Sequence, residues 1–90
     1  MSATGTATVN FGPAATDVTA TVSATGITGA SLVEAWVLPA STASNTADNH
    51  WVEDLVVVAG NIVAGVGFTI YAKCRNGLAH GIYNLGWVHT

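Results

Sequence analysis

An alternation of apolar and polar residues with a period of two constrains the fold of this chain more than any other feature. The segment Asp17–Ala24 has it most regularly: Val18, Ala20, Val22 and Ala24 alternate with Asp17, Thr19, Thr21 and Ser23. This period is typical of a strand with one face on a core and the other in solvent, whereas an amphipathic helix repeats every 3.6 residues. Thr6–Phe11, Val66–Arg75 and Gly81–His89 show the same period. We therefore expect strands and no helix.

Two further segments, Ser31–Leu38 and Trp51–Val58, are apolar on both faces. Such strands are typically covered on both sides. Between them, Ala40–Asn49 consists of small and polar residues, which predicts a long exposed loop. The sequence thus predicts one domain over residues 1–90, an all-β fold in which about six strands form a small antiparallel β-sandwich.

The apolar stretch Leu55–Ala72 carries no charge, and two basic residues follow it. About 18 such residues are the minimum for a membrane-spanning helix, which is the alternative interpretation. Against it, β-branched residues dominate, and each glycine would weaken a helix by up to about 1 kcal/mol. Gly60-Asn61 is typical of a turn, so we expect two strands joined there and no membrane partner. Asn76-Gly77 predicts a further turn, in a hairpin.

Charged residues make up 8% of the chain and hydrophobic residues 50%. Soluble domains average roughly 25% charged residues, and disordered chains have low hydrophobicity and high charge, so this composition excludes disorder. Lys73 and Arg75 are the only lysine and arginine, too few for a nucleic-acid binder that neutralises phosphates. Because so little polar surface cannot cover a small monomer, we expect a homo-oligomer. The expected interface residues are Leu32, Glu34, Trp36, Leu38, Trp51, Leu55, Val57, Tyr83 and Trp87.

The densest group of reactive side chains is Asp48, His50, Glu53 and Asp54. Carboxylates and an imidazole this close in sequence are potential ligands of a divalent cation. The spacing matches no ligand motif, however, and adjacent residues of a strand point to opposite faces. We favour a solvated strand entrance that discourages edge pairing, and we predict neither a metal site nor a cofactor.

No catalytic group emerges from the remaining residues. The carboxylate of Glu34 is expected to be buried and paired with Lys73 or Arg75, from this chain or from a neighbouring subunit, because an unpaired buried charge is costly. The single Cys74 excludes an intrachain disulfide, and its inward position predicts a buried thiol rather than a nucleophile. The serines lie in no Gly-x-Ser-x-Gly motif. We therefore expect a protein that is not an enzyme. The N-terminus lacks the features of a signal peptide, so synthesis in a cytoplasm is expected.

Five motifs resemble those of small tailed-bacteriophage virion proteins. They are Ala7–Gly12, Ser31–Trp36, Asp48–His50, Ile62–Ala72 and Gly86–Val88. The resemblance spans the whole chain. It implies a structural protein of the virion, made in the host cytoplasm, that decorates, cements or projects from the capsid or belongs to a tail appendage. Its partners would be itself and the major capsid protein or tail proteins.

The C-terminal half is also similar to the last strands of H-type lectins, through Asn61–Val63, Gly67–Ile70 and Trp87-Val88. This similarity implies a six-stranded sandwich that forms trimers and binds N-acetylgalactosamine-like sugars at subunit borders. The arginine and acidic loop residues that contact sugar in that family have no clear counterpart here. The alternative function is thus recognition of host glycans. Its candidate ligand-binding residues are Asp48, Asn49 and His50 as hydroxyl partners and Trp51 or Tyr71 as a stacking platform.

Overall fold

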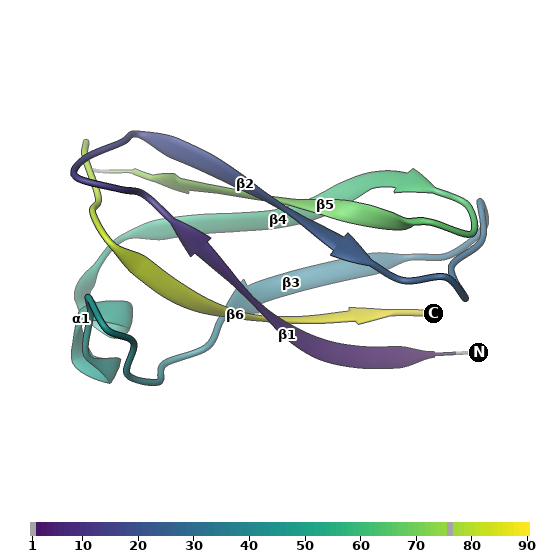
Figure 1. The fold of residues 1–90 in the computed structure, drawn as a ribbon, viewed down its shortest axis with the longest axis horizontal. Coiled ribbons are helices and arrows are strands. Elements are labelled where there is room, and N and C mark those ends of the chain that lie inside the picture. The colour runs from purple at the N-terminus through teal and green to yellow at the C-terminus, as the bar shows by residue number, and fades with distance from the viewer. Residues whose placement is uncertain (1, 76) are drawn as a thin grey trace.

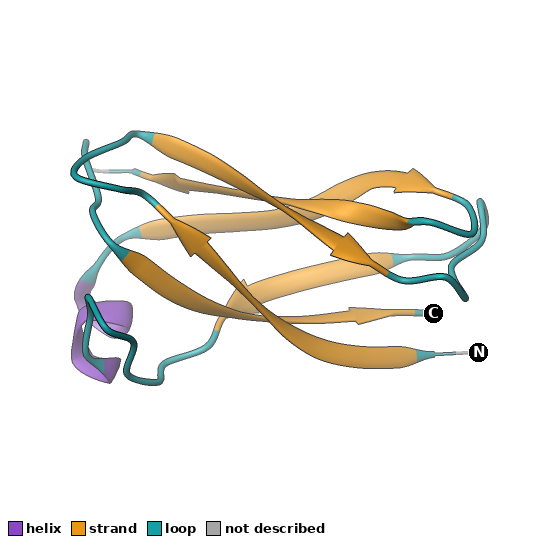
Figure 2. Ribbon diagram, viewed as in Figure 1, coloured by secondary structure: helices purple, strands orange, loops and turns teal. Residues whose placement is uncertain are grey.

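The computed structural model describes residues 2–75 and 77–90, and six strands dominate it. These are β1 (Ala3–Asn10), β2 (Asp17–Ser23), β3 (Val33–Val37), β4 (Leu55–Val63), β5 (Gly67–Cys74) and β6 (Ile82–His89). They form two antiparallel sheets, with strand orders β1-β6-β3 and β2-β5-β4, which pack face to face (Figures 1 and 2). The predicted all-β antiparallel sandwich is confirmed.

The core lies between the two sheets and is built by the predicted alternation. In β2, Val22 is buried while Thr21 and Ser23 are exposed. The two central strands contribute the most deeply buried side chains, including Ile70 from β5 and Leu85 from β6, both 0% exposed. Central strands have a neighbour on each side and the opposite sheet above them, so their inward residues lose the most contact with water.

The apolar stretch Leu55–Ala72 forms β4 and most of β5, as the strand interpretation predicts. The predicted turn at Gly60-Asn61 is wrong. Asn61 has φ 52° inside β4, where the register with β5 shifts between Gly60 and Val63. A left-handed asparagine is accommodated there by a β-bulge, and residues 64–66 make the turn instead. Within the described residues, no helix is long and apolar enough to cross a membrane.

The hairpin predicted at Asn76-Gly77 is also wrong. Strand β5 pairs with β2 and β4, whereas β6 pairs with β1 and β3, so the chain crosses from one sheet to the other. Asn76 itself lies outside the described residues. On the way, Ala79 pairs with Ala15 through two backbone hydrogen bonds of 3.0 Å. The crossing lets β6 fill the central position between β1 and β3.

One short helix, α1 (Ala47–Val52), corrects the expectation of no helix. It occupies the end of the predicted loop Ala40–Asn49 and the start of the predicted strand Trp51–Val58, and it lies at one end of the sandwich (Figure 2). Thr46 and Asn49 cap its N-terminus reciprocally, each side chain bonding the other residue's backbone N–H. Such capping boxes satisfy backbone donors that a first turn leaves unpaired.

The expectation that β3 and β4 are covered on both faces is wrong for the single chain. Both are edge strands, and their outward side chains are open to solvent: Trp36 is 42% and Val58 55% exposed. Glu34 is exposed rather than buried. Within the chain Glu34 pairs with neither Lys73 nor Arg75, because the ion pair among the described residues joins Arg75 to Asp54. Its pairing with a basic residue of a neighbouring subunit stays a prediction.

Candidate functional site

His50 fastens α1 to β6 and is 3% exposed. Its Nε2 accepts a hydrogen bond from the backbone N–H of Asn84 at 2.9 Å. An acceptor Nε2 leaves the proton of a neutral imidazole on Nδ1, which therefore donates to the carbonyl oxygen of Thr46 at 2.7 Å. The ring also packs edge-on against Tyr83, with centroids 5.0 Å apart. Both ring nitrogens are thus occupied, and His50 holds the fold rather than presenting a group to a ligand.

The other three predicted ligand residues of this segment do not converge. Asn49 is engaged in the capping box, Asp48 is exposed in the first turn of α1, and Trp51 is 81% exposed. Tyr71 lies on β5, in the opposite sheet from the strand that His50 contacts. The five candidates therefore do not form one binding site. Among residues 2–75 and 77–90, no three histidine, cysteine, aspartate or glutamate side chains gather as metal ligands would.

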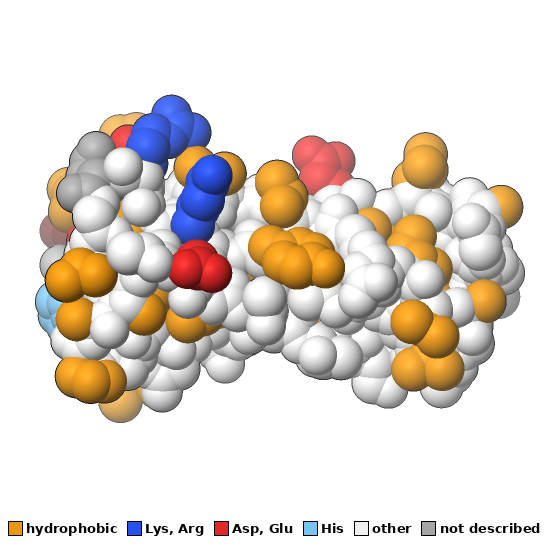
Figure 3. All heavy atoms as spheres, turned by 90° about the horizontal axis from the view of Figure 1, so that it is seen from above, with side chains coloured by type: hydrophobic (Ala, Val, Ile, Leu, Met, Phe, Trp, Pro, Cys, Tyr) orange, Lys and Arg blue, Asp and Glu red, His pale blue; other side chains and the backbone are white. Residues whose placement is uncertain are grey.

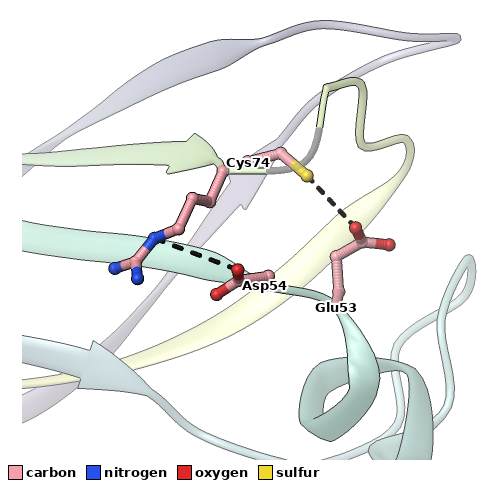
Figure 4. Close-up of polar contacts among 4 residues, drawn as sticks. Glu53, Asp54 and Cys74 are labelled. Carbon is pink, nitrogen blue, oxygen red and sulfur yellow. Dashed lines mark hydrogen bonds and ion pairs between the residues drawn. The ribbon is translucent and has the colours of Figure 1, made fainter.

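A small polar cluster joins the C-terminal end of α1 to β5 (Figure 4). The Cys74 thiol donates to Oε1 of Glu53 at 3.1 Å. Nearby, Nε of Arg75 lies 3.9 Å from Oδ2 of Asp54, with side chains 66% and 43% exposed. An ion pair so exposed contributes about 0–1 kcal/mol. Burial raises the pKa of the Tyr83 phenol, and Glu53 and then Cys74 raise it further.

The outer face of sheet β2-β5-β4 carries the most regular surface feature. Tyr71, 40% exposed, lies between Thr19 of β2 and Val58 of β4 as their cross-strand neighbour. The next outward residue of β5, Lys73, lies between Asp17 and Val56. These residues line a shallow depression of about 430 Å³. In Figure 3, which looks onto this side, apolar side chains stand in the middle of the face beside a pair of opposite charges.

The outer face of sheet β1-β6-β3 carries a second aromatic surface, centred on Trp36. This residue is paired in register with Gly86, and a Cβ built on Gly86 would lie 2.5 Å from the indole Nε1. The indole therefore covers the glycine of the neighbouring strand with one side, while the side chain remains 42% exposed. Glu34 is the preceding outward residue of β3 and is exposed beside it.

The other predicted interface residues differ widely in their exposure to solvent. Leu32, at 74%, is the most exposed of those on β3 and its flanks, and Leu38 is half-buried. Leu55, Val57 and Trp87 pack against the core from the inner faces and are partly buried. Tyr83 is 1% exposed, so it belongs to this chain's own core.

Two features escaped the sequence reasoning. The contact of Cys74 with Glu53 depends on α1, whose only signal was the pair Thr46 and Asn49 at capping-box spacing. The aromatic cover over Gly86 depends on the register of β3 against β6, and nothing local in the sequence reports that register.

Comparison with known protein families, with curated proteins and with solved structures finds no match to this chain. The resemblances to phage virion proteins and to H-type lectins therefore stay predictions.

Proposed function

We propose that this chain is a structural protein of a tailed-bacteriophage virion. It assembles as a homo-oligomer, a trimer, on the capsid surface as a decoration, cement or spike protein, or in a tail appendage. The observation that carries the proposal is the amount of apolar side chain left exposed on so small a domain: Leu32, Trp36, Trp51, Val52, Val58, Val63, Val66, Tyr71 and Leu78 are all at least 40% exposed. A contact with another protein would remove many of these side chains from water.

The edge strand β4 supports the same proposal. Its sequence Leu55–Val63 contains no charged residue and no proline. Exposed edges of monomeric proteins are usually blunted by such residues, because an open edge templates pairing with another chain. The bulge at Asn61 blunts only the C-terminal end of β4. The side chains that could carry chemistry, His50 and Cys74, are meanwhile bonded within the chain, which favours a structural over a catalytic role.

Two measurements test the proposal. Light scattering coupled to size exclusion should give about three times the 9.1 kDa chain mass. The purified oligomer should co-sediment with particles of the phage that encodes it, prepared without this protein. A chain that stays monomeric at 100 µM would contradict the assembly, and an oligomer that binds neither capsids nor tails would contradict the virion role.

A carbohydrate-binding module for host-surface recognition is the alternative, and the depression around Tyr71 favours it. An exposed aromatic ring with Thr19, Asp17 and Lys73 around it offers a stacking surface and hydroxyl partners. Sugar binding would then depend on Tyr71 and not on Asp48, Asn49 or His50, which lie elsewhere. A glycan array with the wild-type protein and with Tyr71→Ala tests this. Binding that the substitution abolishes supports the alternative, whereas no binding to any glycan removes it.

A further inference from the structure

We propose that Glu34 and Trp36 on β3 of one copy dock onto Lys73 and Tyr71 on β5 of a second copy of this chain. This contact rests on the proposed self-assembly and specifies which two surfaces make it. We call the first pair, Glu34 with Trp36, the β3 pair, and the second, Tyr71 with Lys73, the β5 pair.

The two pairs match in geometry. Each consists of residues two apart on one strand, so both members point to the same outer face about 7 Å apart. The charge precedes the aromatic ring in the β3 pair and follows it in the β5 pair. When the two strands run in opposite directions, ring therefore meets ring and acid meets base. Sheets that pack face to face align their strands within about 30°, which permits this register.

The aromatic half of the contact is apolar on both sides. The indole of Trp36 already covers Gly86 with one side and keeps 42% of its surface in solvent. Tyr71 is flanked by Val58, which is 55% exposed, and together they line the depression of about 430 Å³. Tryptophan and tyrosine are the residues that most often dominate the binding energy of interfaces, because they bury a large rigid surface.

The charged half is complementary. Glu34 and Lys73 are both exposed, and the ion pair found within residues 2–75 and 77–90, Arg75 with Asp54, involves neither. Asp17 is the cross-strand neighbour of Lys73 but lies in no ion pair with it. The chain has only two basic residues of this kind against five acids, so an acid on one copy has few partners on the next. A charge pair at the border of an apolar contact fixes its register and excludes wrong partners.

The contact joins different surfaces of the two copies, so each copy can contact two neighbours. Such a heterologous contact closes into a ring or continues as a fibre. Strands β3 and β4 lie beside each other at one side of the sandwich (Figure 1), whereas the β5 pair is on the central strand of the other sheet. A ring closed by three copies would be the trimer proposed above.

A charge swap tests the contact, with Glu34→Lys, Lys73→Glu and the double variant carrying both. Either single substitution places like charges together and should raise the dissociation constant of the oligomer on the order of a hundredfold. The double variant restores opposite charges and should return to within about threefold of wild type. Asp48→Lys makes the same charge change on exposed α1 and should leave assembly unchanged. Circular dichroism confirms that each variant is folded, and analytical ultracentrifugation gives the constants.

The outcomes separate this contact from the assembly itself. Oligomeric wild type with unaffected single variants, or with a double variant as weak as the singles, would overturn the contact and leave self-assembly standing. Monomeric wild type would overturn both the contact and the self-assembly, and the two pairs could then contact only a different protein. Rescue by the double variant alone supports the contact, because a general effect of charge on solubility would not be reversed by a second substitution on another strand.

Discussion

Two tryptophans lie over glycines of neighbouring strands in sheet β1-β6-β3, one on each face of the sheet. Trp87 on β6 is paired in register with Gly5 on β1, and Trp36 on β3 is paired with Gly86 on β6. A Cβ on Gly5 would lie 2.4 Å from the Trp87 ring, and one on Gly86 would lie 2.5 Å from the Trp36 ring. In both places the glycine has no side chain, so the indole ring packs flat over the backbone of the adjacent strand.

The surroundings of the two rings differ. Trp87 points between the sheets, where it meets Phe68 edge-on at 5.4 Å and stacks parallel to His89 at 5.9 Å. Trp36 has solvent beyond it. The same local packing therefore fills the core on one face and leaves a flat apolar surface on the other. Stability is expected to depend on the inner ring, and assembly on the outer one.

The largest effect on folding is expected from Trp87→Ala. Removal of the inner indole leaves a cavity between the sheets and uncovers Gly5, and should lower the free energy of unfolding by about 3–5 kcal/mol. Urea denaturation followed by circular dichroism measures the loss. Trp87→Phe, which keeps a ring against Phe68, should lose clearly less. A loss below about 1 kcal/mol for the alanine variant would show that the inner ring is not a core element.

Gly5→Ala should have the next largest effect. The added methyl group meets the Trp87 ring, which Phe68 and His89 hold in place, so the ring or the strand must shift. Overpacking of this kind costs about 1–3 kcal/mol. The same denaturation experiment applies. A neutral or stabilising substitution would mean that the inner ring moves as freely as an exposed one.

Trp36→Ala should separate stability from assembly. The outer indole is partly buried over Gly86, so its loss should lower the free energy of unfolding of the monomer by about 1–2 kcal/mol, roughly half the value for a fully buried ring. Ultracentrifugation of the same variant should show loss of the oligomer. An alanine variant as unstable as that of Trp87 would contradict the distinction between the two faces.

The sequence predicts the faces of these strands well and their partners poorly. Alternation in Asp17–Ser23 gives the inward and outward residues directly, because each side chain's direction is a local property. The same pattern does not say that β6 lies between β1 and β3, since that depends on contacts across the whole chain. The cover of Gly5 and Gly86 by tryptophans follows from register, so it could not be predicted. The prediction that Glu34 is buried is wrong for the same reason, because its apolar neighbours do not reveal that β3 is an edge strand.

The prediction of loop and strand, without a helix, around α1 is wrong for a different reason. Six helical residues are too few to show a period of 3.6, and the apolar residues Trp51 and Val52 extend the strand-like run of β4. The capping pair Thr46 and Asn49 is the one local sign of the helix. The sequence therefore predicts the candidate site from Asp48 to Trp51 at the junction of a loop and a strand, whereas the helix directs His50 into the sandwich.

Alkaline pH should lower the stability of the fold through the inner face of β6 and not through its outer face. Tyr83 is on the inner face, and burial, with Glu53 and Cys74, raises its pKa above the ordinary value of 10.0. Above about pH 10 the unfolded chain releases this proton while the folded chain retains it, so stability falls as pH rises toward the raised pKa. The loss in free energy of unfolding approaches about 1.4 kcal/mol for each unit by which the pKa of Tyr83 in the folded chain exceeds that in the unfolded chain. Tyr83→Phe should remove this part of the pH dependence in denaturation measured from pH 8 to 11; unchanged pH dependence would contradict it.

The smallest effect is expected from Gly86→Ala, the outer counterpart of Gly5→Ala. Its methyl group meets the Trp36 ring just as closely, but solvent lies beyond that ring and the indole can swing outward. The lost cover over Gly86 is offset because alanine in a strand avoids the roughly 0.5–1 kcal/mol that glycine costs there. The free energy of unfolding should therefore change by less than about 0.5 kcal/mol, while the displaced indole should weaken assembly in ultracentrifugation. Equal destabilisation by Gly5→Ala and Gly86→Ala would mean that the outer ring is held as rigidly as the inner one, and that packing rather than solvent access sets the behaviour of both.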